Sequence, residues 1–364
     1  MTSPVCGFIG LGLIGGSIAK ALKSYDSKIK IIVFDPNSIS TSAALKENIA
    51  DKVCPKIDSS FSECDIIFLC APVSCNNDNL LKIKDVINES AILTDIGSVK
   101  SSVHEKVHEL SLDTQFIGGH PMAGTERIGF INSKKEILEN AYYILTKTKL
   151  TSEQSLSKMY ELVKGMGAIP LIIPFSEHDY VTAAISHVPH VVSAALVNLV
   201  RKSDSKDEIM KTIAAGGFKD ITRISSSSPT MWEQICLTNS SNISKLLSDY
   251  IKELTQIKKA IDAADSPEIR EFFSSARSYR ESFTDVSSGP IKREFVLHID
   301  ISDQPGCLAK VVALLAENNV NIKNIGIVHN REYERGTLKI ELHTQKDLEA
   351  SKVLLKSNDY PLSV

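Results

Sequence analysis

The stretch Gly10-Leu11-Gly12-Leu13-Ile14-Gly15 decides the fold expected for the first part of the chain. It follows a short apolar segment, 5–9, and precedes a segment with helical character, 17–22. In a strand–turn–helix unit of this kind, Gly10 permits the tight turn, Gly12 lets the backbone approach a pyrophosphate, and Gly15 allows close packing of helix on strand. The free N–H groups of the helix N-terminus would then face the phosphates.

An acidic residue follows this turn at the distance that a dinucleotide site requires. Asp35 comes directly after a second apolar segment, 30–34. Its carboxylate can accept hydrogen bonds from a ribose hydroxyl and would repel a 2′-phosphate, which favours NAD over NADP. The alternative is a structural glycine turn, with Asp35 capping a helix before Pro36. The expected cofactor-binding residues are Gly10, Gly12, Leu13, Ile14, Gly15 and Asp35.

Length and composition limit the classes of protein that the chain can belong to. Its 364 residues predict two or three domains, and its 43% apolar and 23% charged residues are typical of a globular protein. A net charge of -3 gives no reason to expect nucleic acid or a membrane as partner. No apolar run approaches the roughly 20 residues of a membrane span, and no leader peptide is evident. Seven cysteines without CxxC spacing indicate reduced thiols in a cytoplasmic protein.

The order of apolar segments predicts the domains. Unbroken apolar strands alternate with helices up to residue 173, which indicates a Rossmann-like, doubly wound α/β domain over 1–173. Residues 174–282 show helical periodicity with wide apolar faces, which suit burial against a second subunit, and we expect them to form a helical substrate and dimerisation domain. Residues 283–292 are expected to form a linker. Residues 293–364 alternate as βαββαβ, a ferredoxin-like arrangement.

Two polar segments, 94–100 and 118–126, come where loops should follow strands. Ligands of doubly wound sheets bind beyond the carboxyl ends of the strands. His120, expected in the second loop between glycines and a proline, is suited to take a proton from an alcohol while hydride leaves the same carbon. A structural histidine is the alternative. Ser98 is expected to hydrogen-bond the same hydroxyl or the nicotinamide amide, to cap the following helix, or both.

A third polar segment, Ser186-His-Val-Pro-His190, lies within the first long helix. His187 and His190 share a helix face, and Pro189 is expected to kink the helix and expose the imidazoles; the alternative is that one of the two is packed. A three-histidine metal site with His120 is conceivable, but no carboxylate completes a metal motif, so we expect no metal.

A fourth segment, Gly216-Gly-Phe-Lys-Asp-Ile-Thr-Arg-Ile224, supplies a candidate carboxylate clamp. The guanidinium of Arg223 can bind a carboxylate through two parallel hydrogen bonds. A surface arginine paired with Asp220 at i, i+3 spacing is the equally open alternative.

Taken together and in this order, the glycine turn and the segments 95–100, 119–126, 186–190 and 217–223 resemble the prephenate dehydrogenase family. The resemblance implies oxidative decarboxylation of prephenate to 4-hydroxyphenylpyruvate with NAD by a homodimer, in tyrosine biosynthesis. It implies that His120 acts on the ring hydroxyl with help from Ser98, and that Arg223 grips a substrate carboxylate. By the same resemblance the residues that line the substrate are His190, His187, Thr125, Gly216 and Trp232, the last from a neighbouring subunit. Glu126 and Asp220 match an ionic network with Arg223 that gates the site.

The C-terminal segment resembles an ACT domain, an amino-acid-sensing module. The matching feature is a strand followed by Asp303-Gln-Pro-Gly-Cys-Leu308 and a helix. The resemblance implies tyrosine as effector, with Asp303, Gly306 and Leu308 as regulatory residues. The alternative is a ferredoxin-like domain that only promotes dimerisation.

Two other functions stay open. One is an arogenate or dual-specificity cyclohexadienyl dehydrogenase, whose substrate differs only in its side chain. The other is a non-catalytic regulator that binds NAD and an amino acid, against which Ser98, His120 and Arg223 argue.

Overall fold

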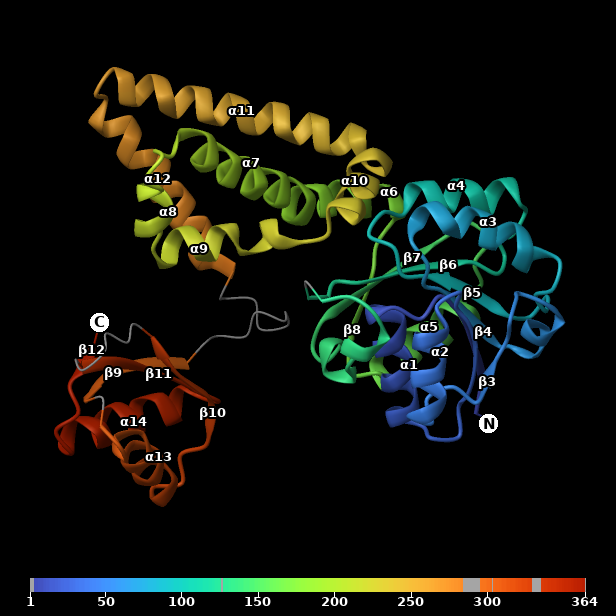
Figure 1. Cartoon of the computed structure of the whole chain (residues 1–364), viewed down its shortest axis with the longest axis horizontal. Coiled ribbons are helices and arrows are strands. Elements are labelled where there is room, and N and C mark those ends of the chain that lie inside the picture. The colour runs from blue at the N-terminus through green and yellow to red at the C-terminus, as the bar shows by residue number, and fades with distance from the viewer. Residues whose placement is uncertain (1–2, 126, 284–294, 303, 329–334, 364) are drawn as a thin grey trace. The chain divides into compact units, whose positions relative to one another are not determined.

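The computed structural model describes residues 3–125, 127–283, 295–302, 304–328 and 335–363. The chain divides into two compact units, Met1–Asp262 and Ala263–Val364 (Figure 1). Apart from Phe283, the expected linker lies outside the described residues, as do Glu126 and Asp303. The domain boundaries expected from the sequence stay predictions.

A parallel sheet of five strands in the order β3-β2-β1-β4-β5 opens the first unit. This is the doubly wound arrangement that the alternating segments predict, and the Rossmann-like fold class is confirmed. The strands are β1 Val5–Ile9, β2 Lys30–Phe34, β3 Lys52–Val53, β4 Ile66–Leu69 and β5 Ile92–Asp95.

Three further strands extend this arrangement: β6 Ile117–Pro121, β7 Tyr142–Lys147 and β8 Ile169–Ile172. A parallel bridge from Leu93 to Phe116 joins β6 to β5. Strand β7 runs antiparallel to β6 and parallel to β8, so the sheet is not parallel throughout. Residues 118–121 belong to β6, and the loop expected to begin at Gly118 begins after Pro121 instead.

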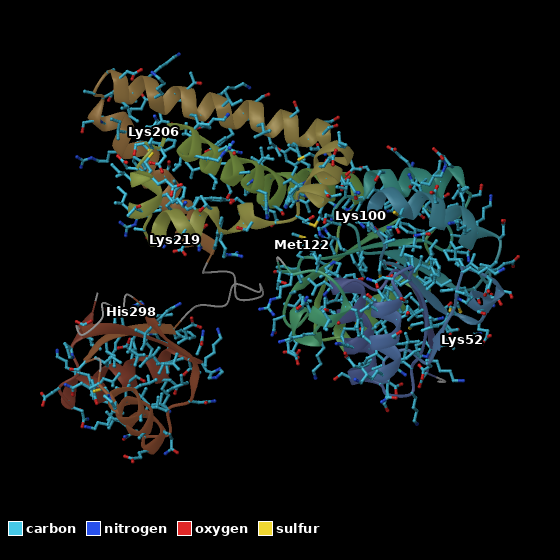
Figure 2. All side chains as sticks on the ribbon, in the orientation of Figure 1. Lys52, Lys100, Met122, Lys206, Lys219 and His298 are labelled. Carbon is cyan, nitrogen blue, oxygen red and sulfur yellow. The ribbon has the colours of Figure 1, made fainter. Side chains whose placement is uncertain are left out.

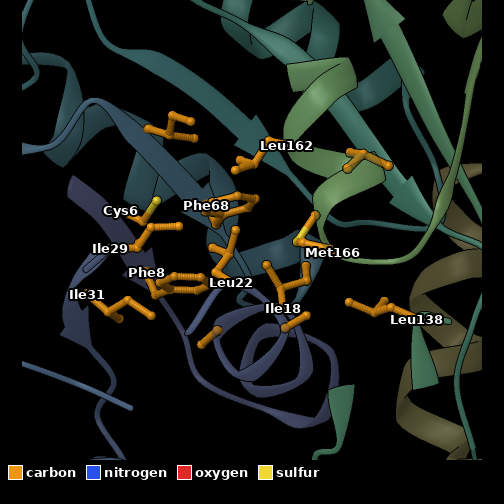
Figure 3. Packing of buried hydrophobic residues seen from close by; sticks show 14 of the residues in the cluster. Cys6, Phe8, Ile18, Leu22, Ile29, Ile31, Phe68, Leu138, Leu162 and Met166 are labelled. Carbon is orange, nitrogen blue, oxygen red and sulfur yellow. The ribbon is translucent and has the colours of Figure 1, made fainter. Parts of the chain in front are cut away.

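Alternate residues of the central strands enter two separate cores, as expected for a sheet that is covered on both faces. Phe8 and Phe68 stack with ring centroids 4.9 Å apart in one core, which Leu22 also enters (Figure 3). Ile9 and Leu69 enter the other core. The helices of this region are α1 Leu13–Tyr25, α2 Ser38–Lys46, α3 Val73–Lys84, α4 Ser101–Glu109 and α5 Glu153–Gly165, with short 3-10 turns η1 Ser59–Glu63, η2 Phe130–Asn132 and η3 Lys135–Ile137.

The rest of the first unit is helical. Its elements are α6 Phe175–Thr182, the π-helical turn η4 Ala183–His187, α7 Val188–Ser203, α8 Ile209–Ile213, α9 Gly216–Thr222, the 3-10 turn η5 Arg223–Ser226, α10 Pro229–Thr238 and α11 Ser240–Asp262. The long helices α7 and α11 lie side by side around a small core of Ala183, Val188 and Ile243 (Figure 1).

One continuous helical stretch, 175–203, is longer and more apolar than we expected. With a mean hydropathy of 1.5 it meets the length and composition of a membrane span, and only 22% of its apolar window is buried within the chain. A single helix of this kind is weak evidence for a span, because helices of soluble proteins pass the same test. Its low burial leaves a large part of its apolar surface exposed in the single chain.

In the second unit, a four-stranded sheet in the order β10-β11-β9-β12 follows helix α12 Ser266–Ser282. The elements are β9 Phe295–Ser302, α13 Cys307–Glu317, β10 Ile322–Val328, β11 Arg335–Leu342, α14 Gln345–Ser357 and β12 Leu362–Ser363. This confirms the predicted βαββαβ order, with all described strand pairs antiparallel.

Candidate active site

The three glycines of the first turn lie in three different environments. Gly10 has φ +93°, and a Cβ there would meet backbone atoms of Cys70 and Ala71 at 2.8–3.0 Å. A Cβ on Gly15 would meet the Cys70 side chain at 2.9 Å and the Gly10 carbonyl at 3.1 Å. No described atom lies within 4 Å of a Cβ on Gly12, and no side chain caps α1 at this residue. The turn therefore combines a packed base with an open backbone, which fits a bound pyrophosphate.

Asp35 holds this turn against the second strand. One carboxylate oxygen accepts the Leu11 N–H at 2.5 Å, and the other accepts the Asn37 N–H at 2.7 Å. The helix cap of α2 is Asn37, which accepts the Ile39 N–H. Each carboxylate oxygen keeps a further lone pair, so Asp35 can still accept ribose hydroxyls. These residues fit NAD, and Leu13 and Ile14, which are predicted to bind it with them, begin α1.

His120 lies in strand β6, not in a loop, and its side chain is only 8% exposed. The glycines before it are strand residues that leave no room for a side chain. A Cβ on Gly119 would meet the Asp95 carbonyl at 2.6 Å, and one on Gly118 would clash with Thr146 Oγ1. Close strand approach therefore explains both glycines. It brings His120 to the carboxyl edge of the sheet, where β1 enters the glycine turn.

A buried ion pair fixes this end of β6 to β5. The ammonium of Lys100 donates to the Asp95 carboxylate and, at 2.7 Å, to the Gly119 carbonyl. Asp95 in turn accepts the Gly119 N–H at 3.2 Å and the Gly97 N–H at 2.9 Å. Burial lowers the pKa of Lys100, and the Asp95 carboxylate opposes that shift. Lys100, labelled in Figure 2, lies where α4 meets α6.

Helix α6 contributes a histidine and an aspartate that reach the same place. His178 Nε2 lies 2.8 Å from His120 Nδ1, and His178 Nδ1 lies 2.8 Å from Asp179 Oδ1. The Asp179 carboxylate also accepts the N–H groups of Lys100 at 2.7 Å and Ser101 at 2.8 Å. The side chains of His178 and Asp179 are almost wholly buried. Together they join the helical region to the first turn of α4.

The electrostatic surroundings of His120 favour the neutral imidazole. Burial holds its pKa well below 6.5, and His178, Lys100 and His187 reinforce that shift. Burial likewise lowers the pKa of His178, although Asp179 opposes it. At neutral pH, His120 therefore has one ring nitrogen that donates and one that accepts.

The two histidines of the third polar segment differ in exposure. His187 is buried, and Asn239 Nδ2 donates to its Nδ1 at 3.1 Å. Burial lowers the His187 pKa to about 4. His190 is half-buried, donates to the Ser186 carbonyl at 2.9 Å, and stacks on the Trp232 indole with centroids 3.9 Å apart. Of the two imidazoles, His187 is the packed one, because the π-helical turn and Asn239 enclose it.

Trp232 lies in α10 of the same chain as His190. Its indole N–H is buried and has no hydrogen-bond partner among the described residues. A contribution of Trp232 from a neighbouring subunit stays a prediction. Across the described residues, no three His, Cys, Asp or Glu side chains gather as a metal site would require.

The remaining predicted substrate residues are more exposed. Arg223 begins the turn η5, and Asp220 and Gly216 lie on α9; all three are exposed. Figure 2 labels Lys219 on this same short helix. Thr125 is exposed and accepts the Arg127 N–H at 3.2 Å. Ser98 is half-buried between β5 and α4, and Glu126 lies outside the described residues.

In the second unit, Gly306 precedes α13 with φ +88°, and no described atom lies within 4 Å of a Cβ there. Leu308 is 41% exposed, and Asp303 lies outside the described residues. A cavity of 450 Å³ lies beside this turn. It is lined by Asp300, Ile301, Ser302, Cys307, Lys356, Asp359, Tyr360 and Pro361.

Four residues of the buried cluster have no role predicted from the sequence: Asp95, Lys100, His178 and Asp179. Asp95 and Lys100 lie within the segment 95–100, but their shared contacts with Gly119 depend on β6 lying beside β5. His178 and Asp179 lie in the polar run 176–179 at the start of a long apolar helical stretch, which was the available sign.

Comparisons with known proteins agree with this architecture. Residues 18–171 match the model of the prephenate dehydrogenase nucleotide-binding domain, 174–275 match that of the prephenate dehydrogenase dimerization domain, and 292–356 match an ACT domain. A prephenate dehydrogenase of Bacillus subtilis is 35% identical over 93% of this chain and 92% of its own length. A cyclohexadienyl dehydrogenase of Zymomonas mobilis is 30% identical over 75% and 93%.

A solved structure shows the same likeness. Prephenate dehydrogenase from Aquifex aeolicus, in complex with hydroxyphenyl propionate and NAD+, superposes with a TM-score of 0.73 at 31% identity. The match covers 78% of this chain and 99% of that one. The chain therefore belongs to the prephenate dehydrogenase family and is an NAD-dependent dehydrogenase.

Proposed function

We propose that the chain converts prephenate to 4-hydroxyphenylpyruvate with NAD, in tyrosine biosynthesis. The observation that carries this proposal is His120, a buried imidazole at the carboxyl edge of the sheet that binds the cofactor. Its lowered pKa keeps it neutral and able to accept a hydrogen bond from an alcohol.

Bound NAD would supply the acceptor for hydride from the ring carbon that bears the hydroxyl, and loss of CO2 from the opposite carbon would make the ring aromatic. His120 accepts the hydrogen bond of that hydroxyl, draws its proton away as the carbon becomes a carbonyl, and returns the proton to the same oxygen when CO2 leaves and the ring becomes a phenolate. A weak base suffices, because the hydroxyl proton becomes strongly acidic once hydride leaves the carbon that bears it. Ser98, two residues before Lys100 on the same edge, is proposed to donate to the hydroxyl oxygen or to the nicotinamide amide.

The substrate carboxylates need a cationic partner. We assign this role to Arg223, whose guanidinium can bind a carboxylate through two hydrogen bonds. His190, His187, Thr125, Gly216 and Trp232 are proposed to line the substrate, and Asp220 and Glu126 to gate it. The bound hydroxyphenyl propionate in the Aquifex relative supports this assignment, because that molecule carries both a ring hydroxyl and a carboxylate.

The alternative is arogenate, or both substrates. The Zymomonas relative is named for the wider cyclohexadienyl class, and the two substrates differ only in a keto or amino group. Comparing kcat/KM for prephenate and arogenate tests the choice. We expect prephenate to be preferred; a preference for arogenate would favour the alternative, and no NADH with either would favour a non-catalytic regulator.

We further propose a cytoplasmic homodimer formed through the helical region. Large apolar side chains are exposed on α7 and α11, among them Leu199 at 60%, Ile251 at 60% and Ile261 at 59%. A second copy would cover them. Sedimentation of the full chain at micromolar concentration should give twice the monomer mass of 39.9 kDa; a monomer would contradict this.

Tyrosine is the proposed effector of the ACT domain. The cavity beside Gly306 carries the cationic Lys356 and the anionic Asp300 and Asp359. Groups of both signs suit the carboxylate and the ammonium of an amino acid. The NADH assay with and without tyrosine is the test, and no change in rate at millimolar tyrosine would contradict the proposal.

A further inference from the structure

His120 is the end of a buried chain of hydrogen bonds that begins at a helix N-terminus. The Lys100 and Ser101 N–H groups donate to Asp179, which faces His178 Nδ1 at 2.8 Å. His178 Nε2 then faces His120 Nδ1 at 2.8 Å. Each link joins a different element: the start of α4, then α6, then β6.

The positions of the protons in this chain follow from Asp179. Burial raises the pKa of its carboxyl, but the hydrogen bonds from His178, Ser101 and Lys100 outweigh burial and lower it. An ionised carboxylate only accepts, so His178 Nδ1 carries a proton. Since burial lowers the pKa of His178, that ring is neutral and its Nε2 has a lone pair. His120 Nδ1 must therefore donate to it.

We propose that His178 and Asp179 are positioning residues that hold His120 in the Nδ1–H tautomer and leave its Nε2 lone pair for the substrate hydroxyl. This inference rests on the proposed function of His120. A free histidine in water favours the opposite tautomer, with the proton on Nε2. That form would present a donor where the reaction needs an acceptor, so the tautomer decides whether His120 can act.

The surrounding contacts keep this chain in place. Thr182 Oγ1 donates to the His178 carbonyl at 2.9 Å, and Asn239 Nδ2 donates to the Asp179 carbonyl at 2.8 Å. On the other side, Lys100 holds the Gly119 carbonyl next to His120. The chain is thus fixed at both ends, and a ring flip of His178 would break two hydrogen bonds.

The direct test is the protonation of the His120 ring in the full-length chain. With 15N-labelled histidine, long-range 1H–15N correlation spectra report which nitrogen carries the proton, and the spectrum of His120→Asn assigns the signal. We expect a protonated Nδ1 and an unprotonated Nε2 at about pH 7.5. A protonated Nε2 in the wild-type chain would overturn the proposal, whatever the activity of any variant.

Two variants separate positioning from a purely structural role. In His178→Gln the amide oxygen can still accept the His120 N–H, whereas His178→Leu has similar bulk and no acceptor. We expect kcat to fall about 100-fold or more in His178→Leu with little change in either KM, and about tenfold or less in His178→Gln. Equal kcat values in the two variants would contradict the proposal; if neither variant folds, the wild-type spectrum decides.

The same experiments distinguish this inference from the proposed function. If His120→Asn keeps full activity, the proposed role of His120 fails, even where its Nδ1–H tautomer is observed. If His120→Asn is inactive and the wild-type ring carries its proton on Nε2, only the positioning role fails.

Discussion

The residues proposed to serve the substrate hydroxyl and those proposed to serve its carboxylate lie in different surroundings. The hydroxyl-side residues (His120, His178 and Asp179) are buried, and hydrogen bonds link them to one another and to the start of α4. The carboxylate-side residues (Arg223, Asp220 and Gly216) lie exposed on α9 and η5. The first set is organised before substrate arrives, whereas solvent competes for the second. Changes in the first should therefore lower kcat, and changes in the second should raise KM.

The largest expected effect comes from His120→Asn, which removes the imidazole from the hydroxyl-side residues. We expect kcat to fall by about 10²–10⁴ with little change in NAD affinity, as is typical for loss of a general base. Steady-state kinetics with an NAD titration measures both. His108→Asn is the matched control, because His108 is an exposed histidine on α4 and should change neither value. Activity that survives in His120→Asn would place the base elsewhere.

Arg223→Ala tests the carboxylate-side residues and should change KM more than kcat, unlike His120→Asn. Loss of charge-assisted hydrogen bonds worth about 1.5–3 kcal/mol should raise the KM for prephenate about 10- to 100-fold, with a smaller effect on kcat. The control is Arg201→Ala, an exposed arginine on α7. An unchanged KM for prephenate in Arg223→Ala would contradict the proposed role of Arg223 in binding the substrate carboxylate.

A substitution in the second unit, far along the chain from both sets of residues, should leave basal kcat and KM unchanged. Gly306→Ala places a side chain at φ +88°, which costs about 1–2 kcal/mol in the left-handed region. We expect the tyrosine concentration for half inhibition to rise about fivefold or more, with basal kcat and KM unchanged. Gly326→Ala in β10 is the control, since that site is equally open and lacks the positive φ. Identical tyrosine responses of the two variants would argue against the turn as effector site.

The smallest expected effect is that of pH on the wild-type chain. His120 acts in its neutral form, so kcat/KM should fall as pH drops through its pKa. Burial and the facing groups His178, Lys100 and His187 hold that pKa well below 6.5. The acid limb of the kcat/KM profile should therefore have its midpoint below pH 6.5, with less than about a twofold fall between pH 7.5 and 6.5. A midpoint at or above 6.5 would mean that the ring is not desolvated as the structure shows.

The sequence predicted the fold and much of the site because both leave local patterns. Alternating strands and helices, the glycine turn with Asp35, and the βαββαβ order all depend on neighbours in the sequence. His178 and Asp179 were missed because their partners lie 58 and 79 residues away, on β6 and at the start of α4. The strand position of His120 was missed because Gly118 and Gly119 resemble a loop, although close packing against Thr146 and Asp95 requires them.

The proposed reaction is the oxidation and decarboxylation of prephenate with NAD. Its most direct test follows NADH absorbance in the purified full-length chain while the product is quantified. We predict one 4-hydroxyphenylpyruvate for each NADH formed, and the loss of both in His120→Asn. NADH formation without that product, or no NADH with prephenate at any pH between about 6.5 and 8, would contradict it.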